Sequence, residues 1–332
     1  MTAPAKPALS AAALKQDEAR EVARIAERLR QIVAHELRRR GLVIAMSSGI
    51  DSSVCAALAA RALGADKVFG LILPERDSSP ESARKAEMLA KHLGIRYLIE
   101  DIAPTLAAIG CYRWRDEAIA RALPEYRPGW PHKIVISGGL EGRINHFRLV
   151  VQPPGQALRD IRLGVSEYLQ IVAATNFKQR IRKTLEYFHA DRLNYGVIGT
   201  PNRLEYDQGF FVKNGDGAAD VKPIAHLYKT QVYALARHLG LPEEICSVRP
   251  TTDTYSLAQG QDEFYFALPY EQMDLALWGY NHAIEPAALA AVLGIAKHQV
   301  EYVYADIKAK RATTRYLHMP PVLIEPVEIP LG

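Results

Sequence analysis

The segment Leu42–Val54, with the sequence LVIAMSSGIDSSV, constrains the fold of this chain more than any other part of it. An apolar run predicts a short buried strand over Leu42–Met46, and a helical pattern follows almost at once over Ser52–Leu63. Only a few small residues separate the two. A strand that passes into a helix through so short a turn is typical of an α/β protein, in which such turns lie at the ligand crevice.

The same alternation of strand and helix continues on both sides of this segment. Helical patterns cover Asp17–Arg40, which Gly41 would close as a C-terminal glycine, and Pro80–Leu93. Apolar runs predict strands over Val68–Leu73 and Arg96–Glu100. Strands alternating with helices predict a doubly wound parallel sheet with helices on both faces.

After Pro104 this rhythm is interrupted. Residues 110–165 are predicted to be an insertion with β structure, because strand-like segments at Phe147–Val151 and Leu158–Leu163 flank the turn-forming Pro153-Pro154-Gly155. The chain is therefore predicted to be an N-terminal arm, residues 1–16, followed by one α/β domain, residues 17–332. In the second half, Tyr195–Gly199 is predicted to be a buried strand, and helical patterns cover Glu167–Ala190 and, for the most part, Tyr228–Leu239 and Glu285–Arg311.

Composition excludes several classes of protein. The chain has 332 residues, of which 48% are hydrophobic and 23% charged, as in soluble globular proteins. The net charge of +4 comes without a long run of Lys or Arg, so no nucleic-acid partner is predicted. No apolar stretch approaches the roughly 20 residues of a membrane span. The three cysteines are far apart, which disfavours a zinc site or a disulfide framework and favours a cytoplasmic location.

The residues between the first strand and its helix suggest an anion site. Ser47, Ser48 and Gly49 are small enough for backbone N–H groups to approach a phosphate, and the N-terminus of the next helix favours negative charge. Asp51 would repel a triphosphate unless Mg²⁺ lay between them. The GK[ST] ending of the Walker loop is absent. The alternative is a plain turn in which Asp51 is a helix N-cap.

The sequence SSGIDSS resembles the SGGxDSS loop of the N-type ATP pyrophosphatases, also called PP-loop enzymes, whose fold is described as adenine nucleotide alpha hydrolase-like. In that superfamily the loop holds the pyrophosphate that leaves when ATP is attacked at its α-phosphorus. Ser48 stands where the superfamily usually has glycine, which should be tolerated if the backbone angles suit a residue with a side chain.

The second half of the chain narrows the resemblance. The segment VIGTPNRLEYDQGFFVKNGDGAADVKPIAHLYKTQVYALARHLGLPEEI is similar to the ammonia-dependent NAD synthetase family, and the similarity extends roughly over residues 17–103 and 166–280. It implies an amide-forming ligase that converts deamido-NAD, ATP and ammonia to NAD, AMP and pyrophosphate through an acyl-adenylate. It also implies a homodimer with the dinucleotide at the subunit interface.

The resemblance also implies roles for individual residues. Asp51 and Glu205 would hold Mg²⁺, and Lys229 would join them as a catalytic residue. Arg180, Lys213 and Asp220 would face deamido-NAD. The ATP-binding residues would be Ser47, Ser48, Gly49, Ile50, Asp51, Ser52, Arg76, Thr200, Lys229 and Thr251.

Each of these residues also has an ordinary structural explanation. Arg180, with its neighbours Arg182 and Lys183, could be the solvated face of a helix, Glu205 a surface carboxylate and Lys229 a side chain at a helix start. The chain departs from the family on the acyl-substrate side, where Thr252-Asp253-Thr254 replaces the usual Ala-Asp-Leu.

Two other functions therefore stay open. The chain could be a paralogue that amidates a different carboxylate, or a nucleotide-binding regulator without turnover. Because 332 residues leave no room for the extra amidohydrolase domain of glutamine-using relatives, free ammonia or ammonia from a separate glutaminase is expected.

Overall fold

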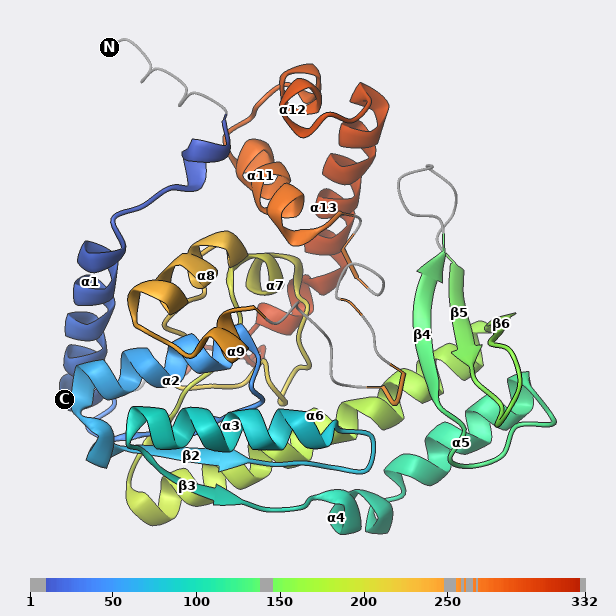
Figure 1. The fold of residues 1–332 in the computed structure, drawn as a ribbon, viewed down its shortest axis with the longest axis horizontal. Helices are drawn as coiled ribbons and strands as arrows, with labels where there is room; N and C mark the ends of the chain where they lie inside the picture. Colours follow the sequence, from blue (N-terminus) through green and yellow to red (C-terminus); the bar gives the residue numbers. More distant parts are fainter. Residues whose placement is uncertain are drawn as a thin grey trace.

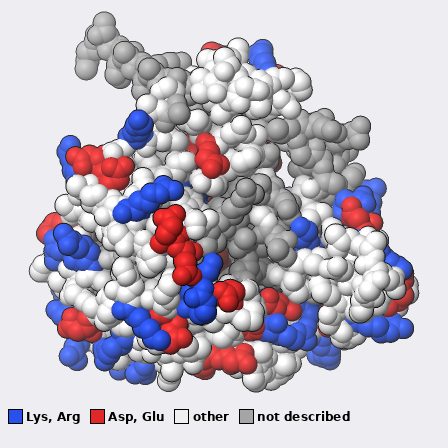
Figure 2. All heavy atoms as spheres, viewed as in Figure 1, with Lys and Arg blue, Asp and Glu red and all other residues white. Residues whose placement is uncertain are grey.

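The computed structural model describes residues 10–137, 146–247 and 268–328, with the short stretches 255–257, 260 and 265–266 (Figure 1). Thr251 and the departure at Thr252-Asp253-Thr254 lie outside the described residues. Among the helices that the structure describes, none is long and apolar enough to cross a membrane. Lys and Arg side chains are interspersed with Asp and Glu on the face shown in Figure 2.

A four-stranded parallel sheet in the order β3-β2-β1-β7 forms the centre of the molecule. Its strands are β1 (Leu42–Ala45), β2 (Val68–Ile72), β3 (Arg96–Ile99) and β7 (Gly196–Val197). Val43 of β1 pairs with Phe69 on one side and with Val197 on the other. The predicted strands are therefore confirmed. The near-continuous apolar character of β1 and β2 follows from their burial on both faces, whereas β3 at the edge is largely exposed.

Helices cover both faces of this sheet, which confirms the doubly wound α/β fold. One core contains apolar side chains of α1 (Glu18–Gln31), α2 (Ile50–Leu63), α3 (Pro80–Leu93) and α8 (Lys229–His238). The other core joins β1, β2 and β7 to the long helix α6 (Val165–Leu193). In Figure 1, α2 and α3 lie in front of the strands and α6 crosses behind them.

The residues between β3 and α6, here called the connecting segment (103–164), hold more regular structure than the sequence predicts. The predicted turn at Pro153-Pro154-Gly155 does join two antiparallel strands, which are β5 (His146–Val151) and β6 (Arg159–Arg162). A third strand, β4 (His132–Ser137), pairs with β5 to complete a small sheet. Two further helices precede it, α4 (Ala103–Ala108) and α5 (Cys111–Ala122).

A separate helical core lies beyond the sheet. Glu285–Arg311 is mainly helical, as predicted, and it contains two helices because Gly294 at φ +67° ends the first of them. Leu14, within the predicted N-terminal arm, is also buried in this core. The helices that form it are α7 (Arg203–Gln208), α11 (Tyr270–Asn281), α12 (Pro286–Leu293) and α13 (Lys297–His318); the short α9 (Glu243–Cys246) follows α8.

The prediction that Gly41 ends the first helix is wrong. The first helix ends in a π-turn at Ile32–Glu36, and the residue in the left-handed conformation after it is Arg38, at φ +51°. Gly41 has a different role. A Cβ atom there would lie 2.3 Å from the carbonyl oxygen of Lys67 and 2.6 Å from the ring of Tyr195. The glycine therefore permits close approach at the start of β1.

Candidate active site

The loop between β1 and α2 brings its small residues together at the carboxyl end of the sheet. Gly49, with φ −68° and ψ 151°, is the N-cap of α2, and no side chain caps this helix end. The hydroxyls of Ser52 and Ser53 donate to the carbonyl of Gly49 at 3.0 and 2.8 Å, and the Oγ atoms of Ser47 and Ser52 lie 3.2 Å apart. These bonds fix a turn whose backbone N–H groups can receive an anion.

Ser48 is the strained member of this loop. Its φ of +65° lies in the left-handed region that favours glycine, and its side chain is buried. The condition for tolerating serine at this position, backbone angles that suit a side chain, is therefore not met. The loop keeps a conformation that glycine would adopt at lower cost.

Asp51 does not cap the helix, so the N-cap alternative is wrong. It belongs to the first turn of α2, and its carboxylate accepts a hydrogen bond from the buried ammonium of Lys229 at the start of α8. Burial disfavours the charged form of Lys229, but the carboxylates of Asp51 and Glu205 outweigh this and raise its pKa above the ordinary value. The ammonium is therefore firmly protonated beside the loop.

Asn202 links the two predicted metal ligands, although sequence reasoning missed it. Its amide Nδ2 donates to Asp51 at 3.1 Å. Its Oδ1 accepts from the backbone N–H groups of Leu204 and Glu205, and Glu205 in return accepts from the Asn202 backbone at 3.1 Å. This is a capping box at the start of α7. The signal was present in the sequence, because Asn-x-x-Glu is the pattern of such a box.

Asp274 of α11 holds the backbone on which Lys229 is mounted. Its two carboxylate oxygens accept from the N–H groups of Lys229 and Thr230 at 3.1 and 2.7 Å, at the N-terminus of α8. Burial raises the pKa of Asp274 to about 7, although these N–H donors oppose the rise. No local pattern could have indicated this residue, because it lies 45 positions from Lys229.

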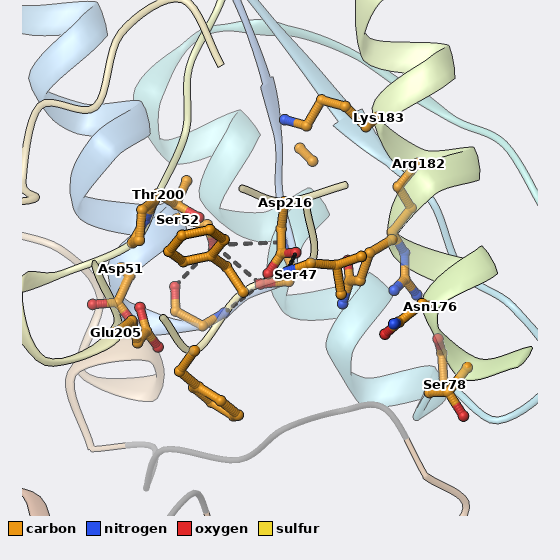
Figure 3. Close-up of a pocket in the computed structure, with 18 of the residues that line it drawn as sticks. Ser47, Asp51, Ser52, Ser78, Asn176, Arg182, Lys183, Thr200, Glu205 and Asp216 are labelled. Atoms are coloured by element: carbon orange, nitrogen blue, oxygen red, sulfur yellow. Dashed lines mark hydrogen bonds between the residues drawn. The ribbon is translucent and has the colours of Figure 1, made fainter. Parts of the chain in front are cut away.

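A cavity of about 1300 Å³ is lined by the loop between β1 and α2, by Glu205 and by Lys229 (Figure 3). Ile136 and Phe147 of the small sheet also line it, so the connecting segment reaches the same cavity. The predicted site residues among its lining are Ser47, Ser48, Gly49, Ile50, Asp51, Ser52, Arg76, Arg180, Thr200, Glu205, Lys213 and Lys229.

The three predicted substrate residues are not gathered in one place. Arg180 lines the cavity and donates to the carbonyl oxygen of Lys213 at 3.3 Å. The ammonium of Lys213 donates to the carbonyl oxygen of Tyr316 at 2.7 Å. Asp220 is not among the residues that line the cavity; its carboxylate accepts from the backbone N–H of Val197 at 2.8 Å and so supports the end of the sheet.

A second ion pair lies in another part of the cavity wall, on α6. The ammonium of Lys183 donates to Glu186 at 2.8 Å, and both side chains are buried. Burial raises the pKa of Glu186, while Lys183 opposes the rise. Asp216, whose pKa burial also raises, accepts from the backbone N–H of Val212 and stabilises the glycine-bearing loop. The structural explanation placed Lys183 on the solvated face of a helix. Because Lys183 is buried, that explanation does not hold for this residue.

The chain is similar to known proteins over most of its length. The family model described as NAD synthase matches residues 21–122 and 144–315. The NH(3)-dependent NAD(+) synthetase of Rhizobium meliloti (strain 1021) is 59% identical over 322 residues, 96% of each chain. The protein of that name from Thermotoga maritima is 39% identical over 246 residues, 73% of this chain and 80% of its own.

A solved structure supports the fold independently. The NH3-dependent NAD synthetase from Campylobacter jejuni, in complex with the nitrate ion, superposes with a TM-score of 0.62 at 22% identity and covers 94% of this chain and 100% of its own. The part of the chain left out between the two ranges of the family model falls inside the predicted insertion, 110–165, and is shorter than it. On the length of the family match and the identity to these relatives, the chain belongs to the NAD synthase family.

Proposed function

We propose that this protein is an ammonia-dependent NAD⁺ synthetase that uses ATP to convert the carboxylate of deamido-NAD to an amide. The observation that carries the proposal is the cluster of Asp51, Asn202, Glu205 and Lys229 beside an uncapped helix N-terminus. Asp51, Glu205 and Lys229 line a cavity that is large enough for a nucleotide. The names of the relatives at 59% and 39% identity support the same activity.

Asp51 and Glu205 fit a Mg²⁺ ion. Both carboxylates line the cavity beside the loop between β1 and α2, here called the phosphate loop (Ser47–Gly49). Mg²⁺ prefers hard oxygen donors such as carboxylates. Within the described residues, no group of three or more His, Cys, Asp or Glu side chains could hold a metal by itself. Two carboxylates together with phosphate oxygens of the nucleotide form a normal donor set for Mg²⁺, which would neutralise phosphate charge there.

The residues of the chain supply positioning and charge. The N–H groups at Gly49 and at the start of α2 would hold the β- and γ-phosphates, and Arg76 and Thr200, which also line the cavity, would contact ATP. A carboxylate oxygen of the substrate attacks the α-phosphorus, and the bond to the bridging oxygen of pyrophosphate breaks. The ammonium of Lys229 stabilises the charge that grows on the leaving pyrophosphate.

The second step needs no side-chain nucleophile. Ammonia attacks the acyl carbon of the adenylate, AMP leaves with the bonding electron pair, and one proton is lost from nitrogen. Arg180 and Lys213, which also line the cavity, would hold the substrate. We propose no role for Asp220 within a single chain.

A homodimer and a cytoplasmic location belong to the same proposal. Apolar side chains of α6, among them Val165, Leu169 and Phe188, are more than half exposed and would suit a second copy of the chain. The three cysteines are all free and buried, as expected in a reducing compartment. Light scattering tests the dimer: twice the mass of 36.9 kDa is expected.

The activity is tested by incubating the protein with MgATP, ammonium and deamido-NAD and measuring the products. AMP, pyrophosphate and NAD⁺ are expected in equal amounts. Pyrophosphate release with a different acid in a panel, but not with deamido-NAD, would identify the paralogue instead. ATP binding with no turnover on any acid would identify the regulator, and formation of ADP would contradict the mechanism.

A further inference from the structure

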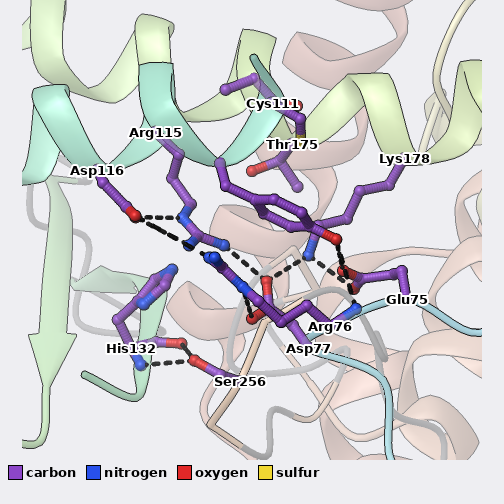
Figure 4. A network of polar contacts seen from close by, with 12 residues as sticks. Glu75, Arg76, Asp77, Cys111, Arg115, Asp116, His132, Thr175, Lys178 and Ser256 are labelled. Carbon is purple, nitrogen blue, oxygen red and sulfur yellow. Dashed lines mark hydrogen bonds and ion pairs between the residues drawn. The ribbon is translucent and has the colours of Figure 1, made fainter. Parts of the chain in front are cut away.

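The loop that follows β2 carries Arg76 into the cavity between two anchored acidic neighbours (Figure 4). Glu75 accepts from the ammonium of Lys178 at 2.9 Å and from the hydroxyl of Tyr112 at 2.9 Å. Asp77 accepts from Lys178 at 2.8 Å and from the guanidinium of Arg115 at 2.6 Å. The residues on either side of Arg76 are therefore fixed by α5 and α6.

Tyr112 of α5 contacts Arg76 directly as well. The centre of the Arg76 guanidinium lies 3.8 Å from the centroid of the Tyr112 ring, and the Tyr112 hydroxyl accepts from the Arg76 backbone N–H at 3.4 Å. Asp116, one turn further along α5, has a carboxylate oxygen 4.0 Å from the Arg76 Nη2 atom, and Asp77 has one 3.8 Å from its Nε atom. A cation over an aromatic face is attracted by the ring, and more strongly when partly desolvated.

Arg76 differs from the other two cations of this group in how far its side chain is exposed. Arg115 and Lys178 have side chains only 2% exposed, whereas the Arg76 side chain is 41% exposed and lines the cavity. The buried pairs hold the loop, and of the three cations Arg76 is the one whose side chain lines the cavity, where a ligand can reach it. An arginine held in one orientation loses less side-chain freedom on binding than one free to rotate.

We propose that Tyr112, together with Asp116, is a positioning residue that holds the Arg76 guanidinium ready for the adenosine part of ATP. The inference rests on the proposed function, in which Arg76 contacts that nucleotide. It assigns to the connecting segment a role in ATP affinity, although its small sheet lines another part of the cavity.

The test measures Kd for MgATP by calorimetry on the full-length protein, so that it does not depend on the identity of the acid. Tyr112→Leu removes the ring and is expected to weaken ATP binding about fivefold. Tyr112→Phe keeps the ring beneath the guanidinium and is expected to restore Kd to within about twofold of the parent value. In the steady state, KM for ATP should rise in Tyr112→Leu while kcat and KM for deamido-NAD change less than about twofold.

Tyr304→Leu is the matched control. It truncates a partly buried tyrosine of α13 that bonds to the carbonyl of Ile284 and does not line the cavity, so ATP affinity should stay at the parent value. If Tyr112→Leu does not fold, Asp116→Asn carries the test, with an expected weakening of two- to threefold. A folded variant of either kind that binds ATP as tightly as the parent would overturn the positioning role.

Arg76→Ala separates the inference from the proposed function. Weaker ATP binding in Arg76→Ala but not in Tyr112→Leu would overturn the positioning role and leave the proposed contact intact. Unchanged binding in Arg76→Ala would remove the contact itself. In the Arg76→Ala background, Tyr112→Leu should have no further effect on Kd, and an additive effect would show that Tyr112 acts elsewhere.

Discussion

Two clusters of ions lie beside the cavity, and they differ in charge balance. At the phosphate loop, the carboxylates of Asp51 and Glu205 face one ammonium, that of Lys229. Beside α5, three carboxylates meet three cations, and the residues concerned are Glu75, Asp77 and Asp116 with Arg76, Arg115 and Lys178. A cluster with excess negative charge suits a cation that arrives with a ligand, whereas a balanced cluster suits a structural junction, which here holds the loop that carries Arg76.

The largest effect is expected at the unbalanced cluster. Asp51→Asn and Glu205→Gln preserve shape and remove charge, so each should reduce kcat by about a thousandfold or more through loss of Mg²⁺ and phosphate positioning. The free energy of unfolding should change little, because one surplus negative charge is removed. Glu301→Gln, in an exposed pair with Lys297, is the control that should keep full activity. Near-parent activity of either variant at limiting Mg²⁺ would show that the metal assignment is wrong.

The balanced cluster should show the opposite pattern. Asp77→Asn leaves Arg115 and Lys178 without a shared carboxylate, so the free energy of unfolding should fall by about 3 kcal/mol at pH 7. Any surviving kcat should stay within about twofold of the parent. Asp160→Asn breaks the exposed pair with Arg148 and should cost less than about 1 kcal/mol.

The free energy of unfolding is also expected to depend on pH through Asp77. Burial opposes the charge on Asp77, but Lys178 and Arg115 prevail and lower its pKa from 3.8 to about 2. A lowered pKa means that the carboxylate stabilises the fold above about pH 4, and that this stability is lost as the pH falls towards 2. Urea unfolding between pH 5 and 3 should therefore show a steeper decline for the parent than for Asp77→Asn. Equal slopes would contradict the assignment.

Substitutions of Asn202 are expected to have smaller effects, and they distinguish its capping of α7 from its hydrogen bond to Asp51. Asn202→Ala removes both the helix cap and the donor to Asp51, and it should cost about 1 kcal/mol of stability and about tenfold in activity at low Mg²⁺. Asn202→Ser keeps a capping oxygen but is too short to reach Asp51. It should restore stability and leave activity low. If serine restored both, Asn202 would serve only the helix.

The smallest effect concerns strain in the phosphate loop. In the described part of the connecting segment, no residue other than glycine has a positive φ, whereas Ser48 does. Ser48→Gly should therefore raise the free energy of unfolding by roughly 1 kcal/mol. Ser79→Gly is the contrasting control, because Ser79 has an ordinary φ of −69° and caps α3, and its loss should destabilise by a few tenths of a kcal/mol. The same sign for both variants would exclude strain at Ser48.

The sequence predicts local features well and long-range ones poorly. The apolar runs at Leu42 and Val68 predict strands because a sheet buried on both faces leaves a continuous local pattern. The helix α5 escaped prediction, since its buried face includes Arg115, which periodicity counts as polar. Gly41 resembles a helix stop in sequence, although its role depends on contacts with Lys67 and Tyr195.

The candidate site follows the same division. Ser47, Ser48, Gly49 and Asp51 lie close together in the sequence and are predicted from their own chemistry. Glu205 and Lys229 are predicted only through the resemblance to a family. The role of Asp274 could be identified only from the structure, because its contact with Lys229 leaves no local pattern in the sequence. The resemblance implied a substrate contact for Asp220, but in the single chain Asp220 is not among the residues that line the cavity.

The partners of Asp51 have a consequence for the order in which the protein becomes active. Asn202 and Lys229 follow Asp51 by 151 and 178 residues. At a synthesis rate of about 5–20 residues per second, the phosphate loop leaves the ribosome roughly 10 to 35 s before Lys229 does. The first three strands can pair during that interval, but the ammonium that steadies the departing pyrophosphate is still missing. A chain released early should therefore be an inert fragment, unable to consume ATP without making its product.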